Sequence, residues 1–149
     1  MKKDRLVAGG LAGLIGALVQ NAYGQTTKAL GITDRTFIDF AETMLVREVY
    51  GGLSGFIIGT LAHAAVGIMM GVIFAYLIKF TSSRYHLLKG AGFGFILWFL
   101  LSSFGTIYNL KNFAHIPPNT ALSTLGGALI YGLVTAYTLG FLERRTGLL

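Results

Sequence analysis

The mostly apolar stretch Gly51–Ile78, GGLSGFIIGTLAHAAVGIMMGVIFAYLI, contains no Asp, Glu, Lys or Arg and sets the class of this protein. About 20 apolar residues, each rising about 1.5 Å along a helix, cross the hydrocarbon of a bilayer, so the stretch predicts a membrane-spanning helix. Every fourth position in it holds a small residue, with one histidine in the row: Gly51, Gly55, Gly59, His63, Gly67 and Gly71. Such a row forms a ridge on which glycine lets a second backbone approach closely.

His63 falls near the middle of this predicted span, where an ionisable side chain is costly and is therefore a functional candidate. The residues leave three interpretations open. In the first, a neutral imidazole hydrogen-bonds a neighbouring helix, for example at Ser102 or Thr124. In the second, it binds a small solute or gates its passage. In the third, it ligates haem with a second His63 from a two-fold dimer, because His86 and His115 fall near opposite membrane surfaces.

The whole chain has the composition of a membrane protein. Hydrophobic residues make up 54% of its 149 residues and charged residues only 12%, which does not describe a soluble domain of this size. The apolar residues form four blocks, at 6–23, 51–78, 90–108 and 121–142. We therefore expect a single domain over 1–149, an all-α membrane protein with four transmembrane helices. The absence of cysteine excludes disulfides and cysteine-ligated metal centres.

The net charge of +6 is distributed unevenly between the loops. Eight of the twelve basic residues lie at the two ends of the chain and in the loop between the second and third blocks, and four lie in the other loops. This bias predicts that both termini are cytoplasmic. Nucleic-acid binding would need a basic face with readout residues, so we expect no nucleic-acid partner and attribute the charge to topology and anionic lipid headgroups.

The four blocks match one another in pairs. A shift of 81 residues lays the first block on the third, and a shift of 61 residues lays the second on the fourth. The matched positions are Gly9 with Gly90, Gly13 with Gly94, Gly67 with Ala128, Gly71 with Gly132 and Ala75 with Ala136. We expect two hairpins that form a parallel repeat about a pseudo-two-fold axis along the membrane normal. Residues 1–24 also resemble a signal peptide, but the later counterpart favours an uncleaved helix.

The loop Gly24–Tyr50 carries a further helical pattern. Its apolar residues form the stripe of an amphipathic helix over 34–47: Phe37, Phe40, Ala41, Met44 and Leu45. Thr33 is the predicted N-cap, with Asp34 in the first turn. The helix either lies flat in the outer membrane interface or covers an outward-facing pocket. In the second case the candidate contacts are Asp39, Glu42, Arg47 and Glu48. The short loop 81–89 predicts that the second and third spans are antiparallel neighbours.

Polar residues of the four spans gather in the halves predicted to face outward. They suggest a polar vestibule whose candidate ligand or pore residues are Gln20, Asn21, Thr60, His63, Trp98, Ser102, Thr106 and Thr124. The predicted helix-packing residues are Gly9, Gly13, Gly51, Gly55, Gly59, Gly67, Gly71, Gly132 and Gly140. Every carboxylate lies outside the apolar blocks, so we expect no catalytic triad and no enzyme. No histidine accompanies Asp39 and Glu42 locally, so we expect no metal site.

The length, the Lys-rich start and the paired Gly-x3-Ala-Tyr segments at 71–76 and 132–137 resemble families of small four-helix inner-membrane proteins of bacteria. The resemblance implies the bacterial cytoplasmic membrane and implies no activity. Four glycine-rich helices enclose little volume, so we also expect a homo-oligomer. Three functions follow as hypotheses. They are binding or transport of a small polar solute or ion, an accessory or anchor role beside other membrane subunits, and haem binding through His63.

Overall fold

The computed structural model describes residues 4–48 and 50–146, and every regular element in this part of the chain is helical. The elements are α1 (Arg5–Ala29), α2 (Phe37–Val46), α3 (Gly52–Thr81), α4 (His86–Ile107), the 3-10 turn η1 (Lys111–Phe113) and α5 (Pro118–Thr146). Four of them, α1, α3, α4 and α5, are long and apolar enough to cross a membrane. The four predicted spans are therefore present as helices, and α1 continues beyond the predicted block to Ala29.

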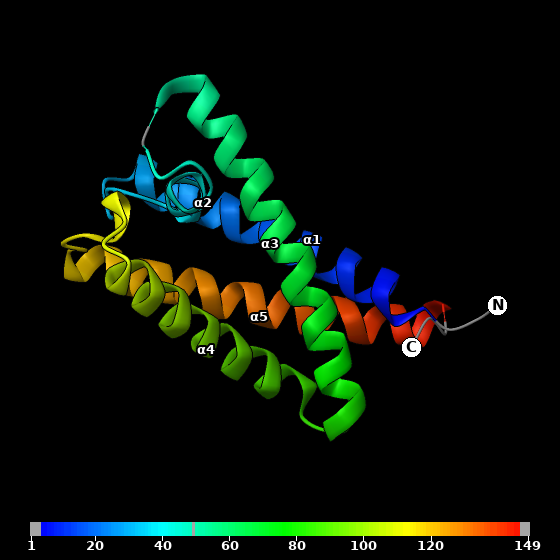
Figure 1. Ribbon diagram of the computed structural model, residues 1–149. Helices are drawn as coiled ribbons and strands as arrows, with labels where there is room; N and C mark the ends of the chain where they lie inside the picture. Colours follow the sequence, from blue (N-terminus) through cyan, green and yellow to red (C-terminus); the bar gives the residue numbers. More distant parts are fainter. Residues whose placement is uncertain (1–3, 49, 147–149) are drawn as a thin grey trace.

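The four long helices do not form a closed ring. Helix α1 packs against both α3 and α5, and α5 packs against both α1 and α4, so the order across the bundle is α3, α1, α5, α4. Helices α3 and α4 meet only beside their short connection and then diverge (Figure 1). The prediction that they are antiparallel neighbours therefore holds only beside this connection. Elsewhere their small residues face α1, α2 and α5, so the contact between α3 and α4 is confined to the region of Phe74 and Phe93.

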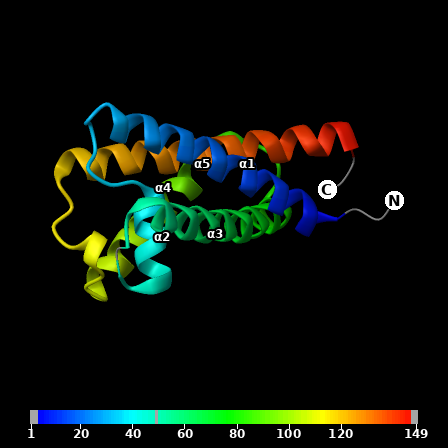
Figure 2. The ribbon, with the colours of Figure 1, turned by 90° about the horizontal axis from the view of Figure 1, so that it is seen from above.

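The two ends of the bundle differ. Helix α1 begins and α5 ends at one end, which we call the terminal end, and α2 lies against α3 at the other, which we call the α2 end (Figure 2). The buried apolar cluster that joins α1, α3 and α5 consists of Ala8, Ala12, Phe74, Ala75, Ile78, Ala136 and Leu139. The rings of Phe74 and Phe93, which lie 5.2 Å apart, connect α3 with α4 near this cluster.

Glycines bring helices into backbone contact in the α1–α3 and α4–α5 pairs, and Gly59 of α3 does the same against α2. In the α1–α3 pair, a Cβ added at Gly71 would overlap the carbonyl oxygen of Gly9 and lie 2.6 Å from the nitrogen of Gly13. In the α4–α5 pair, a Cβ added at Gly132 would overlap the carbonyl oxygen of Gly90 and lie 3.0 Å from the nitrogen of residue 94. Only glycine allows such close approach of helices. The two pairs of long helices are thus tight interfaces of the fold.

The small-residue row of α3 serves two partners. Gly55 and Gly59 face α2, where an added Cβ at Gly59 would lie 2.7 Å from Ile38 Cγ2, whereas Gly67 and Gly71 face α1. A helix turns about 100° per residue, so twelve residues separate two directions that differ by about 120°. A row with a spacing of four therefore cannot face one partner along its whole length.

Two other glycines behave differently from the expected packing role. Gly51 lies just before α3 with a φ of 63°, and no atom lies within 4 Å of a Cβ added there. Gly51 is therefore a turn residue, because its left-handed backbone favours glycine, and its predicted packing role is wrong. Gly140 faces the side chain of His86, whose Nε2 would lie 3.2 Å from an added Cβ, rather than a second backbone.

Helix α2 begins later than predicted. Its N-cap is Thr36, whose backbone N–H donates to the Asp39 carboxylate at 2.6 Å, so the prediction of Thr33 as the cap is wrong. The Thr33 hydroxyl donates instead to the carbonyl of Arg35 at 2.8 Å and to the hydroxyl of Thr120 at 3.1 Å. These bonds tie the segment before α2 to the start of α5.

Two polar residues of α2 outside its apolar stripe are buried. Glu42 is 3% exposed, and its Oε1 accepts a hydrogen bond from the backbone N–H of Tyr50 at 2.8 Å. Thr43 is fully buried and accepts from Asn112 Nδ2 at 2.7 Å. These side chains are buried because α2 packs between α3 and η1.

Candidate functional site

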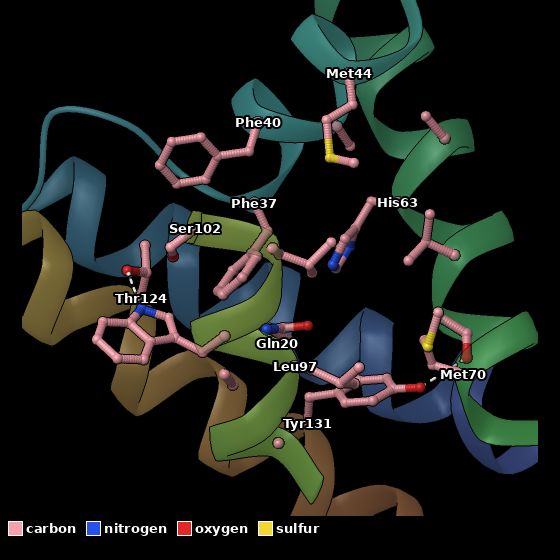
Figure 3. Close-up of a pocket in the computed structure, with 18 of the residues that line it drawn as sticks. Gln20, Phe37, Phe40, Met44, His63, Met70, Leu97, Ser102, Thr124 and Tyr131 are labelled. Carbon is pink, nitrogen blue, oxygen red and sulfur yellow. Dashed lines mark hydrogen bonds between the residues drawn. The ribbon is translucent and has the colours of Figure 1, made fainter. Parts of the chain in front are cut away.

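A cavity of about 330 Å³ lies between the diverging helices α3 and α4, towards the α2 end (Figure 3). This volume is at the low end of the range of small-molecule sites, which is roughly 300–1,000 Å³. Helix α3 contributes one wall from Ala62 to Met70, and α4 contributes the other from Gly94 to Ser102. Helices α1 and α5 close the back of the cavity with Gln20 and Tyr131.

The five apolar residues of the predicted stripe all line this cavity: Phe37, Phe40, Ala41, Met44 and Leu45. None of the four charged residues proposed as contacts of a covering helix belongs to the lining: Asp39, Glu42, Arg47 and Glu48. The α2 helix thus covers the cavity with its apolar side. The charged side of α2 holds the helix in place instead, as in the ion pair between Lys28 and Asp39 at 2.8 Å.

Five of the eight candidate ligand residues meet in this cavity: Gln20, His63, Trp98, Ser102 and Thr124. The other three lie elsewhere. Thr106 is exposed, and its hydroxyl donates to the carbonyl of Ser102 at 2.8 Å. Asn21 Oδ1 and Thr60 Oγ1 are buried away from the lining without a hydrogen-bond partner in the described part of the chain. Asn21 follows Gln20 by one residue, which turns its side chain by about 100° on α1.

His63 lies where the small-residue row of α3 changes partner. The two glycines just before it in the row pack against α2 and those after it pack against α1, and the imidazole between them faces the cavity. It is 8% exposed and stacks on Phe37 with ring centroids 5.6 Å apart. Within the described residues no hydrogen bond reaches the imidazole, and Nδ1 is fully buried. The expected bond to Ser102 or Thr124 is therefore absent.

The hydroxyl of Thr124 is bonded within α5 and to α4 instead. It donates to the carbonyl of Thr120 at 2.8 Å and accepts from Trp98 Nε1 at 3.1 Å. This bond joins α4 and α5 beside the cavity and fixes the plane of the indole. Trp98 and Thr124 of the lining are thus bonded to each other, whereas the imidazole of His63 is bonded to no described residue.

Gln20 is the second buried polar residue of the lining whose side chain has no hydrogen-bond partner among the described residues. It is 4% exposed, and no hydrogen bond in the described part of the chain involves its amide. Figure 3 shows the amide and the His63 ring pointing into the space between α3 and α4. A buried polar group left unpaired costs about 1–3 kcal/mol. An occupant with a donor or acceptor would therefore be held by both residues.

Tyr131 belongs to the site although it was not among the predicted residues. Its hydroxyl donates to the carbonyl of Gly67 at 2.7 Å, which joins α5 to α3 at the base of the cavity. It follows Thr124 by seven residues and Ala128 by three, so the three residues share one face of α5. Extending the face of Thr124 along the helix would have found it.

The lining is neutral and mostly apolar. Its polar side chains are the imidazole, the Gln20 amide, the indole, two hydroxyls and the Tyr131 phenol. In the described residues, 4–48 and 50–146, no cluster of three or more His, Cys, Asp or Glu side chains could hold a metal ion. No family model, curated protein or solved structure matches the chain. The chemistry of the site therefore rests on its own geometry.

Proposed function

We propose that this chain is a membrane protein that binds a small neutral molecule in the cavity under α2 and carries it within or across the membrane. The observation that carries the proposal is the convergence of Gln20, His63, Trp98 and Ser102 from three separate helices on one cavity. Groups that only joined helices would be spread over separate contacts. The neutral lining favours a largely apolar molecule with one or two hydrogen-bonding groups over an ion, because an unpaired charge is costly there.

Native mass spectrometry of the protein released from its own membrane tests this proposal. We expect a bound small molecule in the wild type and a lower bound fraction in His63→Ala and Gln20→Leu. Thr106→Val is the matched control, because Thr106 is an exposed polar candidate outside the cavity, and it should keep the wild-type occupancy. Wild-type protein that carries no small molecule, or equal occupancy in all four proteins, would contradict the proposal.

An accessory role in a larger membrane complex is the second proposal. It is supported by the unpaired sides of α3 and α4, where Leu61 is 67% exposed and Phe99 is 58% exposed. Purification in a mild detergent distinguishes the proposals, because an accessory subunit would copurify with a second membrane protein in fixed ratio. The same sample tests haem binding through His63 by its visible absorption and homo-oligomer formation by its mass.

We further propose that the two hairpins are a parallel repeat with both termini in the bacterial cytoplasm. The contacts support the repeat because matched residues meet matched atoms. Gly71 faces the carbonyl oxygen of Gly9 and the nitrogen of Gly13. Its counterpart after a shift of 61 residues, Gly132, faces the same two atoms of Gly90 and Gly94, which are the counterparts of Gly9 and Gly13 after a shift of 81 residues. In this proposal the α2 end lies on the outer side of the membrane, and the excess of basic residues at the other end supports that orientation.

A further inference from the structure

The proposed repeat lacks one of the helix–helix interfaces that its pseudo-two-fold symmetry requires. The pseudo-two-fold operation that takes α1 to α4 and α3 to α5 also takes the α1–α5 interface to an α4–α3 interface. The first interface is extensive and the second is nearly absent. Helix α2, which belongs to the longer loop of the first hairpin, packs against α3, and its apolar stripe lines the space between α3 and α4. The cavity thus occupies the position of the missing interface.

The side of the cavity between α3 and α4 is open. Ala65 in the α3 wall is exposed, and Leu97 and Leu101 in the α4 wall are only half-buried. The neighbouring outward side chains are large and apolar, as at Leu61 and Phe99. Such surfaces on two membrane-spanning helices face lipid chains, so this opening leads into the membrane.

The α2 end is closed. Phe40 and Phe113 are both nearly buried, and their ring centroids lie 4.6 Å apart, so α2 and η1 are packed together over the cavity. Asn112 Nδ2 also donates to the carbonyl of Asp39 at 2.7 Å, which fastens the two elements. A molecule from the water at this end would have to displace α2, whereas a molecule in the membrane meets an open side.

We propose that the occupant is a single-chain neutral amphiphile, with one hydrocarbon chain and a hydroxyl or carbonyl group, that reaches the cavity sideways from the membrane. The chain contacts the apolar walls of α2, α3 and α4. The polar group hydrogen-bonds the Gln20 amide and the His63 imidazole, the two buried side chains of the cavity lining for which the described chain supplies no hydrogen-bond partner. This inference rests on the proposed function and names the class of its ligand.

Trp98 provides the readout, because it is the only tryptophan of the chain and lines the cavity. The full chain is reconstituted in phosphatidylcholine vesicles, and a long-chain fatty alcohol with a brominated chain is added as the quencher. We expect a saturable loss of Trp98 fluorescence in the wild type. Ala65→Phe fills the opening and should leave only the linear quenching by bulk amphiphile. Leu61→Phe, one turn away and outside the lining, should keep the saturable part.

A second variant keeps the test independent of any packing defect. Gln20→Leu preserves the volume but removes the amide, so the midpoint of saturable quenching should move to about fivefold more alcohol. Brominated phosphatidylcholine in place of the alcohol should give only linear quenching, and a saturable loss would assign the site to a membrane lipid and overturn the single-chain proposal.

Water-soluble acrylamide distinguishes failure of this inference from failure of the proposed function. If acrylamide quenches Trp98 and Ala65→Phe blocks that quenching, while the alcohol shows no saturable part, the cavity takes solutes from water and the amphiphile proposal is overturned. If Ala65→Phe changes neither the quenching by acrylamide nor the quenching by the alcohol, the cavity is not an accessible site. That result would overturn both the amphiphile proposal and the proposed function.

Discussion

A single methyl group at Gly71 should separate the α1–α3 pair. The added Cβ would overlap the carbonyl oxygen of Gly9 and lie 2.5 Å from Gly13 Cα, which is about 1 Å short of ordinary contact. All the atoms it meets are backbone atoms of α1, so no side chain can turn away to relieve the overlap. The helix itself must move.

The expected loss follows from two opposed effects. Overpacking a tight interface costs about 1–3 kcal/mol, whereas alanine gains up to about 1 kcal/mol over glycine in helix propensity. We therefore expect Gly71→Ala to lose about 1–2 kcal/mol of unfolding free energy. Gly132→Ala should lose a similar amount, because it makes the matched contact with Gly90 in the α4–α5 pair.

The control is Gly92→Ala. Gly92 lies exposed on α4, and no atom lies within 4 Å of a Cβ added there, so this substitution should be neutral or stabilising by up to about 1 kcal/mol. Unfolding is followed by circular dichroism in detergent micelles to which a denaturing detergent is added. Gly71→Ala at wild-type stability, or an equal loss in Gly92→Ala, would refute the close contact between the α1 and α3 backbones.

Two further predictions concern single interactions, and a third concerns the topology. Tyr131→Phe should lower the unfolding free energy by about 1 kcal/mol, because it removes the hydrogen bond from α5 to the backbone of α3, and unchanged stability would contradict that bond. The hydrogen bond from Arg35 lowers the pKa of Asp34 below its ordinary 3.8, so its stabilising effect is complete at neutral pH and is lost as the pH falls through the lowered pKa. Asp34→Asn should remove that acid-dependent part of the unfolding curve, and an identical pH profile would refute it. In this cysteine-free chain, a cysteine at Lys111 should react with an impermeant maleimide from outside intact cells, and one at Ser83 should not. The reverse labelling would invert the proposed topology.

Several parts of the site can be predicted from the sequence alone. The length of the apolar blocks located the four spans, because the thickness of the hydrocarbon sets a minimum length for any helix that crosses it. The spacing of Phe37, Phe40 and Met44 identified the side of α2 that lines the cavity, since one face of a helix repeats with its turn. His63 and Gln20 were identified as candidates because polar side chains inside a span are costly.

Other parts depended on how distant segments pack. The row of Gly59, His63 and Gly71 predicts close contacts but not their partners, because it winds around α3 and meets α2 first and α1 later. Glu42 is a charged residue outside the apolar stripe of its helix, yet it is buried because α2 packs against α3, and the backbone N–H of Tyr50, eight residues later, donates to it. The partners of the glycine row and of Glu42 lie more than two helical turns away along the chain, so the local sequence pattern does not identify them.

Local periodicity and composition thus indicate which residues of this chain enter helices, which helices are long and apolar enough to cross a membrane, and which side of α2 is apolar. They act over one or two turns, so they do not select a partner. The separation of α3 from α4 arises only in the folded chain, where α1 and α2 occupy the glycine row of α3 and the row of Gly90 is occupied by α5. The cavity forms because α3 and α4 pack against other helices instead of against each other, and no short stretch of sequence shows which helices will pack together.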